Sequence, residues 1–492
     1  MKERATTSKQ RGGMTRREFL GTAASAAAAF TIVPRHVLGG PGHIPPSDKI
    51  NLAMIGVGGQ GTYDMSQFML LPEVQVIAVA DPVKEMDYSK FYFGGVKGRE
   101  PAKQLVNETY AKLAGNGYSG CNAYVDFYEM LEKEAGIDAV CVSTTDNVHA
   151  FGAMAAIKKK KHVYCQKPLT HDVWEARQLT LAAREHKVMT QMGNQGRAGE
   201  GNRLMVEWIE DGAIGDIIEV HSWTDRPAGY WPQGVTRPDY VPAVTPDTID
   251  WDRWVGPAPM RPYHPIYLPF NWRGWWDYGT GALGDMGCHI LDTPVWALKL
   301  GHPTAVQASS SPFTEDSGPI ASVVTFEFPA RGKMPALKLM WYEGGLTPPR
   351  PVELEAGRRV GDGSGTLFVG TKGAIMCNTY AEQPRLVPET KMKAYKQPPK
   401  RLKRVPNGLA GIYADFINSI KTGEPACSNF DVSGPLSEIV LMGNLAVRAN
   451  AAFQDKGLRG QRLLWDGEKM EVTNIPEANK YVKREYREGW TL

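Results

Sequence analysis

A glycine-rich segment near residue 56 has the spacing of a phosphate-binding turn. The run "MIGVGGQG" places glycines at 56, 58 and 61, after an apolar strand pattern and before a helical one. Gly56 would permit the tight turn, Gly58 the approach of backbone to a pyrophosphate, and Gly61 close helix–strand packing. The free amides that follow, including those of Gly59 and Gln60, are suited to phosphate oxygens. The segment predicts a dinucleotide site; a glycine turn in an unrelated α/β fold is the alternative.

Asp81 favours the dinucleotide interpretation. It ends the second apolar run, "VQVIAVAD", and lies 20 residues after Gly61. An acidic side chain at that position can bind the ribose hydroxyls of NAD, and it would repel the 2′-phosphate of NADP. We therefore predict NAD in preference to NADP.

A polar loop, "STTDNVHA", follows a further strand pattern. Loops at the carboxyl ends of parallel strands face the nucleotide crevice. Thr144, Asn147 and His149 are therefore candidates for cofactor contacts. The alternative is that Asp146 or Asn147 only caps the next helix.

Lys167 ends the next strand, in "VYCQKPLT", and Pro168 stops the strand there. A strand this apolar should be interior and should end at the same crevice. We therefore predict a lysine near nicotinamide and substrate, against the alternative of a solvated surface lysine.

A second chemical cluster lies in "GTGALGDMGCHILD". Asp285 and His289 are four residues apart and would share one helix face, with Asp292 three residues further on. One interpretation is acid–base chemistry by a histidine oriented by a carboxylate. A metal site and a buried structural histidine are the alternatives.

These residues require particular elements to position them. Strand and helix patterns alternate from residue 49 to 193, which predicts a Rossmann-type doubly wound parallel sheet. Residues 194–492 read as an α+β domain with an open, mainly antiparallel sheet, a helix over 199–211 and late helices near 411–421 and 433–451. Residues 39–48 are a Gly/Pro-rich linker.

The first 38 residues resemble a twin-arginine export signal. Arg16 and Arg17 precede Phe19, Leu20 and a mild Ala-rich stretch, too short for a stable membrane span. We expect export to the periplasm by the twin-arginine machinery, with removal of the segment left open. An amphipathic or disordered tail is the alternative.

The composition excludes some other functions. Residues 1–48 carry seven Lys or Arg and three Asp or Glu, so a net charge of +3 leaves the rest near neutral, unlike a nucleic-acid binder. The six cysteines show no CxxC spacing and read as buried free thiols. Eight of the 13 tryptophans lie between Trp223 and Trp296. Flat aromatic faces near arginines suit a polyhydroxylated ring, which makes Arg273 and Trp276 substrate candidates.

Together, "GVGGQG", "VADP", "QKPL" and "GALGDMGCHILD" resemble the glucose–fructose oxidoreductase, inositol dehydrogenase and rhizopine-catabolism family, Gfo/Idh/MocA. The resemblance runs from about residue 49 to the C-terminus. It implies a Rossmann domain and a substrate-binding open-sheet domain that often forms homo-oligomers. It also implies hydride transfer between NAD(P) and a hydroxyl carbon of a sugar or cyclitol.

By this resemblance His289 is the general base, Lys167 polarises the reacting oxygen and Asp285 orients the imidazole. The segment "GNQGR" resembles one that approaches the nicotinamide, which adds Asn194 and Arg197 as cofactor and substrate candidates. Gln166, also expected at the cofactor, replaces the family's usual glutamate. A neutral amide there removes a charge that would favour the ammonium form of the adjacent lysine.

The leading hypothesis is thus an exported NAD-dependent oxidoreductase acting on a sugar, glycoside or cyclitol. Because little free NAD exists outside the cytoplasm, its cofactor should be tightly held. A redox-neutral NAD-dependent glycosidase and a non-catalytic sugar-binding relative are the alternatives.

Overall fold

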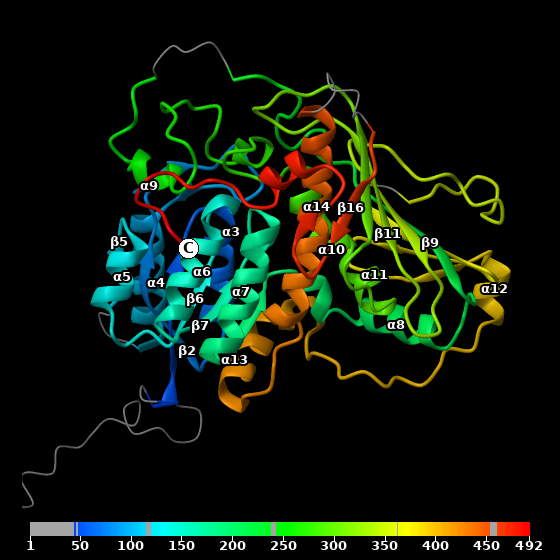
Figure 1. Cartoon of the computed structure of the whole chain (residues 1–492). Coiled ribbons are helices and arrows are strands. Elements are labelled where there is room, and N and C mark those ends of the chain that lie inside the picture. The colour runs from blue at the N-terminus through cyan, green and yellow to red at the C-terminus, as the bar shows by residue number, and fades with distance from the viewer. Residues whose placement is uncertain (1–43, 46–47, 115–119, 238–242, 362, 453–459) are drawn as a thin grey trace, which may run out of the picture. The chain divides into compact units, whose positions relative to one another are not determined.

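The computed structural model describes residues 44–45, 48–114, 120–237, 243–361, 363–452 and 460–492. Residues 50–492 form one compact unit (Figure 1). The predicted export signal, residues 1–38, lies outside the described residues. Within the described ranges, no helix has both the length and the apolar character needed to cross a membrane.

The first sheet has six strands, all parallel, and its strand order reverses between β1 and β6. In sheet order the strands are β5 (Asn122–Tyr124), β2 (Val74–Ala80), β1 (Ile50–Ile55), β6 (Ala139–Val142), β7 (His162–Cys165) and β8 (Thr190–Met192). This is the doubly wound arrangement that the sequence predicts. Ligands bind such sheets outside the carboxyl ends of the strands at the reversal point.

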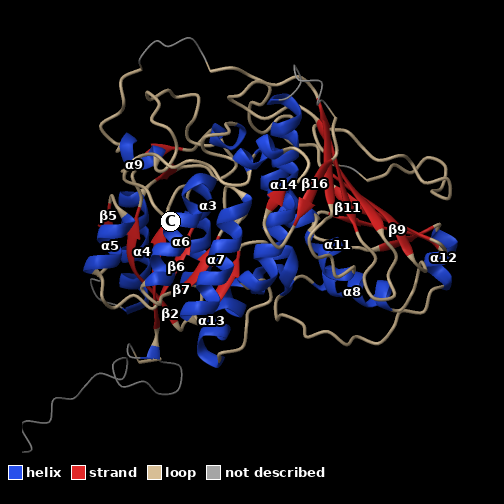
Figure 2. Cartoon of the chain, in the orientation of Figure 1, coloured by secondary structure: helices blue, strands red, loops and turns tan. Residues whose placement is uncertain are grey.

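Helices cover both faces of this sheet (Figure 2). They are α3 (Gly59–Met69), α4 (Arg99–Ala114), α5 (Phe127–Lys133), α6 (Asp146–Lys158) and α7 (Val173–His186). The side chain of Asp172 accepts the Glu175 amide and caps α7. The alternative in which Asp146 or Asn147 caps α6 is wrong, because Thr145 precedes that helix without a side-chain cap and Asp146 bonds Thr280 instead.

The second sheet has nine strands, antiparallel except for the pair β9 and β12. In sheet order they are β15 (Arg385–Val387), β14 (Gly373–Asn378), β13 (Gly365–Gly370), β9 (Ile217–Trp223), β12 (Leu337–Tyr342), β11 (Ser322–Phe328), β10 (Ala305–Ser310), β16 (Leu463–Asp466) and β17 (Glu471–Val472). The predicted open, mainly antiparallel sheet is confirmed. A separate short hairpin joins β3 (Met86–Asp87) and β4 (Val96–Lys97).

The second half of the chain contributes α8 (Glu200–Glu210), α9 (Trp251–Val255), α10 (Gly281–Ile290), α11 (Asp292–Ala297), α12 (Glu389–Ala394), α13 (Ile412–Thr422) and α14 (Phe430–Ala452). Short 3-10 turns are η2 (Gln195–Ala198), η3 (Asn271–Gly274), η4 (Gly408–Gly411) and η6 (Pro476–Tyr481). The long helix α14 packs on α7 of the first domain and on α10, β10 and β11, so it lies between the two sheets (Figure 2).

The C-terminal segment returns to the first domain. The Arg484 guanidinium donates to Glu175 at 2.8 Å and to the Asn147 carbonyl at 2.6 Å. Arg487 donates to Asp252 at 2.5 Å, at the start of α9. All six cysteines are free, and five of them are buried.

Candidate active site

The glycine-rich turn lies where β1 passes into α3. Gly56 has a φ of +85°, and a Cβ atom there would come within 2.7 Å of the Ser143 carbonyl oxygen. A Cβ atom on Gly61 would collide with the carbonyl oxygen of Gly56. Side chains are therefore excluded at both positions, and α3 begins directly beside β1 with no side-chain cap on its first amides.

Asp81 lies at the end of β2 and faces the same space. Its carboxylate accepts the amides of Val57 and Val83, both at 2.8 Å. Burial raises the pKa of Asp81. Each carboxylate oxygen has a second lone pair, which a ribose hydroxyl can use.

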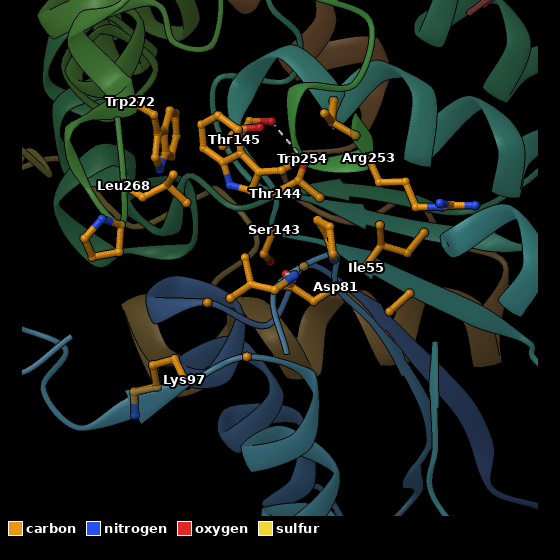
Figure 3. Close-up of a pocket in the computed structure, with 18 of the residues that line it drawn as sticks. Ile55, Asp81, Lys97, Ser143, Thr144, Thr145, Arg253, Trp254, Leu268 and Trp272 are labelled. Carbon is orange, nitrogen blue, oxygen red and sulfur yellow. Dashed lines mark hydrogen bonds between the residues drawn. The ribbon is translucent and has the colours of Figure 1, made fainter. Parts of the chain in front are cut away.

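These residues line a pocket, here called the nucleotide cavity (Figure 3). Asp81 and Ser143 form one side of it, and Trp254, Leu268 and Trp272 lie on the other. Trp490, near the end of the chain, also lines it. The tryptophan-rich region, which the sequence suggested for sugar binding, contributes Trp254 and Trp272 to this cavity, and Trp272 also lines the larger cavity described below.

The hairpin of β3 and β4 brings aromatic side chains onto the glycine-rich turn. A Cβ atom on Gly58 would lie 2.7 Å from the Tyr88 hydroxyl, and one on Gly59 would collide with the Phe93 ring. The Tyr88 hydroxyl also accepts the Gly59 amide. That amide is one that a phosphate would use, so Tyr88 occupies a phosphate-binding position.

The residues present fit NAD. The glycine-rich turn, the first amides of α3 and Asp81 match the pyrophosphate and ribose, and Thr144 lines the cavity after the end of β6. His149 serves a structural purpose beside them: its ring nitrogens contact the carbonyls of Pro168 at 2.7 Å and Thr144 at 3.2 Å. Burial lowers the pKa of His149 to about 4.

A larger cavity of about 1020 Å³ adjoins the nucleotide cavity and shares Gly59, Ser143, Thr144 and Arg273 with it. Lys167, Asp285 and His289 all line this larger cavity. The Lys167 Nζ donates to the Asp285 carboxylate at 2.8 Å and to the Asp285 carbonyl at 2.9 Å. The three residues that the sequence selected, one from the turn after β7 and two from α10, are therefore brought together.

Asp285 is surrounded by cations. Besides Lys167, Arg226 donates to its other carboxylate oxygen at 2.5 Å, and Arg273 lies 3.5 Å away. Burial alone would raise the pKa of Asp285, but these three cations hold it well below its usual range. Both carboxylate oxygens of Asp285 thus face cations, and its orientation of His289 stays a prediction.

His289 is buried and lies edge-on to Tyr380, with ring centroids 5.3 Å apart. Its Nδ1 atom is buried without a hydrogen-bond partner among the described residues. Burial, reinforced by the charge of Lys167, lowers the pKa of His289 to about 3. The imidazole is therefore neutral at ordinary pH and able to accept a proton.

Gln166 does not contact the Lys167 ammonium group. Its amide donates to Asp64 of α3 at 3.0 and 3.2 Å. Asp64 is fully buried and also accepts hydrogen bonds from Gln60, Ser143 and Tyr413. The counter-charge of Lys167 comes from Asp285, so the neutral residue at position 166 leaves the lysine paired.

Comparison with known proteins decides the family. Residues 50–194 match the model "Oxidoreductase family, NAD-binding Rossmann fold", and residues 212–325 match "Oxidoreductase family, C-terminal alpha/beta domain", both of Gfo/Idh/MocA. Together the two matches cover more than half of the chain. The protein belongs to the Gfo/Idh/MocA oxidoreductase family. Its first domain is accordingly an NAD-binding domain.

Curated relatives in this family match only part of the chain. A 1,5-anhydro-D-fructose reductase of Ensifer adhaerens is 28% identical over 39% of this chain and 47% of its own length. A glycosyl hydrolase family 109 protein of Akkermansia muciniphila is 26% identical over 40% of this chain and 39% of its length. An inositol 2-dehydrogenase of Rubrobacter xylanophilus is 26% identical over 42% of this chain and 52% of its own length. The chain thus spans about half the length of the curated relatives it matches, or less.

Two solved structures share the fold. The WlbA dehydrogenase of Bordetella pertussis, solved with NADH and UDP-GlcNAcA, has a TM-score of 0.53 at 16% identity, covering 85% of this chain and 99% of its own. The aldose–aldose oxidoreductase of Caulobacter crescentus, solved with glycerol, has a TM-score of 0.52 at 15% identity, with the same coverage of each chain.

Three predicted site residues have structural partners in this chain, so their part in binding stays a prediction. Asn194 donates to the Cys288 carbonyl at 3.4 Å and accepts the Ser428 hydroxyl at 2.6 Å. Arg197 pairs with Asp292 at 2.9 Å. Asn147 is buried and donates to the Val255 carbonyl at 2.9 Å. None of the three predicted side chains lines either cavity.

Trp276 is also a core residue, packed edge-on against Phe313, with Arg448 over its ring at 5.4 Å. Conversely, Tyr92, Tyr230 and Tyr380 line the larger cavity and were not selected from the sequence. They lie in irregular segments, where the hydrophobic periodicity of the sequence carries no signal.

The metal-site alternative gains no support from the structure. Asp292 forms an ion pair with Arg197, and no cluster of three or more potential metal ligands occurs in the described part of the chain.

Proposed function

We propose that the protein is an NAD-dependent oxidoreductase acting on a hydroxyl carbon of a sugar, glycoside or cyclitol. The observation that carries the proposal is the convergence of Lys167, Asp285 and His289 on one cavity that opens beside the NAD site. The names of the reductase and dehydrogenase relatives support it.

Each residue has a defined task in this proposal. Bound NAD supplies the hydride acceptor. The neutral imidazole of His289 takes the proton of the substrate hydroxyl as the carbon–oxygen double bond forms. The ammonium group of Lys167 donates to the same oxygen, and Asp285 holds that ammonium in place through its 2.8 Å contact.

We propose further that the protein is exported by the twin-arginine route and keeps its cofactor bound. The support for export is the sequence of residues 1–38. The support for retention is the lining of the nucleotide cavity by Trp254, Trp272 and Trp490, from two distant parts of the chain. The Arg487–Asp252 pair ties those two parts together. Assembly into a homo-oligomer stays a prediction from the family resemblance.

The test begins with mass spectrometry of the cofactor released from purified protein, followed by a sugar screen that follows reduction of the bound nicotinamide. Lys167→Ala and His289→Ala should each lower turnover by about 10²–10⁴-fold while NAD stays bound. A protein without any nicotinamide cofactor, or unchanged turnover in both variants, would refute the proposal.

A redox-neutral glycosidase is a second candidate. Its support is the similarity to glycosyl hydrolase family 109 proteins of Akkermansia muciniphila and Shewanella pealeana. In that case a sugar carbon is oxidised transiently, the aglycone is eliminated, water adds and the carbon is reduced again. Release of an aglycone from a chromogenic glycoside without net reduction of NAD would select this candidate.

A further inference from the structure

The charges around the larger cavity do not balance. Its charged lining consists of four cationic side chains and two carboxyl groups, namely Lys97, Lys167, Arg226, Arg273, Asp146 and Asp285. Lys167, Arg226 and Arg273 all lie within 3.5 Å of the single carboxylate of Asp285. Asp146 is turned to the Thr280 amide and hydroxyl, at 3.0 and 2.6 Å. Partly desolvated cations in excess of their counter-ions are costly unless a further anion joins them.

The cofactor accounts for part of this excess. The pyrophosphate of NAD is negatively charged and belongs at Gly58 and Gly59. Lys97 and Arg273 line both cavities and can face it. Arg226 lines only the larger cavity, on the substrate side.

Arg226 is placed to receive an anion. One of its five N–H donors bonds Asp285 at 2.5 Å, and the described residues provide no second acceptor for it. Its guanidinium plane lies over the Tyr230 ring at 4.1 Å, which fixes its orientation. A held, partly exposed guanidinium fork matches the geometry of a carboxylate or phosphate.

We propose that the substrate is an anionic carbohydrate, a sugar bearing a carboxylate or phosphate group, and that Arg226, assisted by Arg273, binds that group. This inference rests on the proposed function. Lys167 and Arg226 take opposite oxygens of Asp285, so one sugar ring can present a hydroxyl to the lysine and its anionic group to the arginine.

The experiment uses the purified, NAD-loaded protein and matched probes: D-glucose, D-glucuronate and D-glucose 6-phosphate, and D-galactose with D-galacturonate. The measured quantity is the ratio of kcat/KM for the anionic sugar to that for its neutral partner. A charge-assisted contact to a guanidinium should make this ratio about 10 to 100. The uronate and phosphate arms show which anion is recognised.

Arg226→Gln should reduce that ratio about 10- to 100-fold, and Arg226→Lys should restore part of it. Arg261→Gln is the matched control, because Arg261 pairs with Asp277 at 3.1 Å and does not line the larger cavity. Calorimetric binding of glucuronate and methyl glucoside to the wild-type protein gives a second readout that needs no variant.

Equal or better use of neutral sugars by the wild type would overturn the inference and leave the oxidoreductase standing. An equal loss on both sugar classes in Arg226→Gln would also overturn it, by showing that Arg226 only supports Asp285. If no sugar of either kind reduces the cofactor, the proposed function itself fails.

Discussion

Replacing Gln166 by glutamate should destabilise the protein strongly at neutral pH. In the wild type the Gln166 amide lies 3.0 and 3.2 Å from the two oxygens of Asp64, which is fully buried. Glutamate would put a second carboxylate at that place, and no cation contacts Asp64 in the described part of the chain. Two like charges about 4 Å apart repel by about 4 kcal/mol at an effective dielectric constant of about 20. That is a large fraction of the stability of a typical domain.

The destabilisation should depend on pH with a definite sign. In the folded variant, repulsion between the Asp64 carboxylate and the glutamate introduced at position 166 raises the pKa of this carboxyl pair. In the unfolded chain, glutamate titrates near pH 4.3. Between those values the folded variant binds more protons than the unfolded one, so its stability falls as pH rises. The loss in free energy of unfolding relative to wild type should be small near pH 5. It should grow by about 1.4 kcal/mol per pH unit until it approaches the full repulsion of about 4 kcal/mol above pH 7.

Denaturant unfolding between pH 5 and 8 measures this effect. The double variant Asp64→Asn/Gln166→Glu exchanges the acid and the amide, and it should recover to within about 1 kcal/mol of wild type. Gln104→Glu is the matched control, because Gln104 bonds Glu108 at 2.7 Å on the exposed face of α4; it should change stability by no more than about 0.5 kcal/mol. A Gln166→Glu protein as stable as wild type at pH 8 would refute the account of position 166.

Three further outcomes are expected. Tyr88→Phe should tighten NAD binding about 2- to 10-fold in calorimetry, because a hydroxyl that competes for the Gly59 amide is removed; weaker binding would contradict this. Trp490→Ala should speed the loss of bound NAD on dilution about tenfold or more, since burial of an aromatic side chain contributes about 1.5–3 kcal/mol; unchanged release would exclude Trp490 from cofactor retention. Because burial lowers the pKa of His289 to about 3, kcat/KM should hold from pH 8 down to pH 5. An acid limb near pH 6.5 that disappears in His289→Ala would show that the imidazole titrates normally.

Much of the site could be predicted where a residue's neighbours in sequence also determine its place. Gly56 and Gly61 lie in one strand–turn–helix unit, and Asp81 ends the adjacent parallel strand. Lys167 lies in the turn that follows β7 at the same sheet edge. Other predicted residues, such as Arg197, occupy the expected segment but turn their side chains to a partner in another element, here Asp292.

Residues that went unnoticed have partners far away along the chain. The Asp64–Gln166 contact joins positions that are 102 residues apart in the sequence. The Tyr413 hydroxyl donates to Asp64 from a position 349 residues away. The cover of the nucleotide cavity likewise combines Trp272 with Trp490. No local spacing encodes such pairs, because which elements meet depends on how they pack.

The sequence by itself determined the doubly wound sheet, the NAD-binding turn and the trio Lys167, Asp285 and His289, because strand ends, glycine conformations and helical spacing are local properties. Only the tertiary structure decided how those groups are used. It paired Asp285 with Lys167 and Arg226, and it placed the Gln166 amide as a hydrogen-bond donor to Asp64. The physical reason is that the ionisation and hydrogen bonding of a buried group depend on whichever charges the fold brings within a few ångströms.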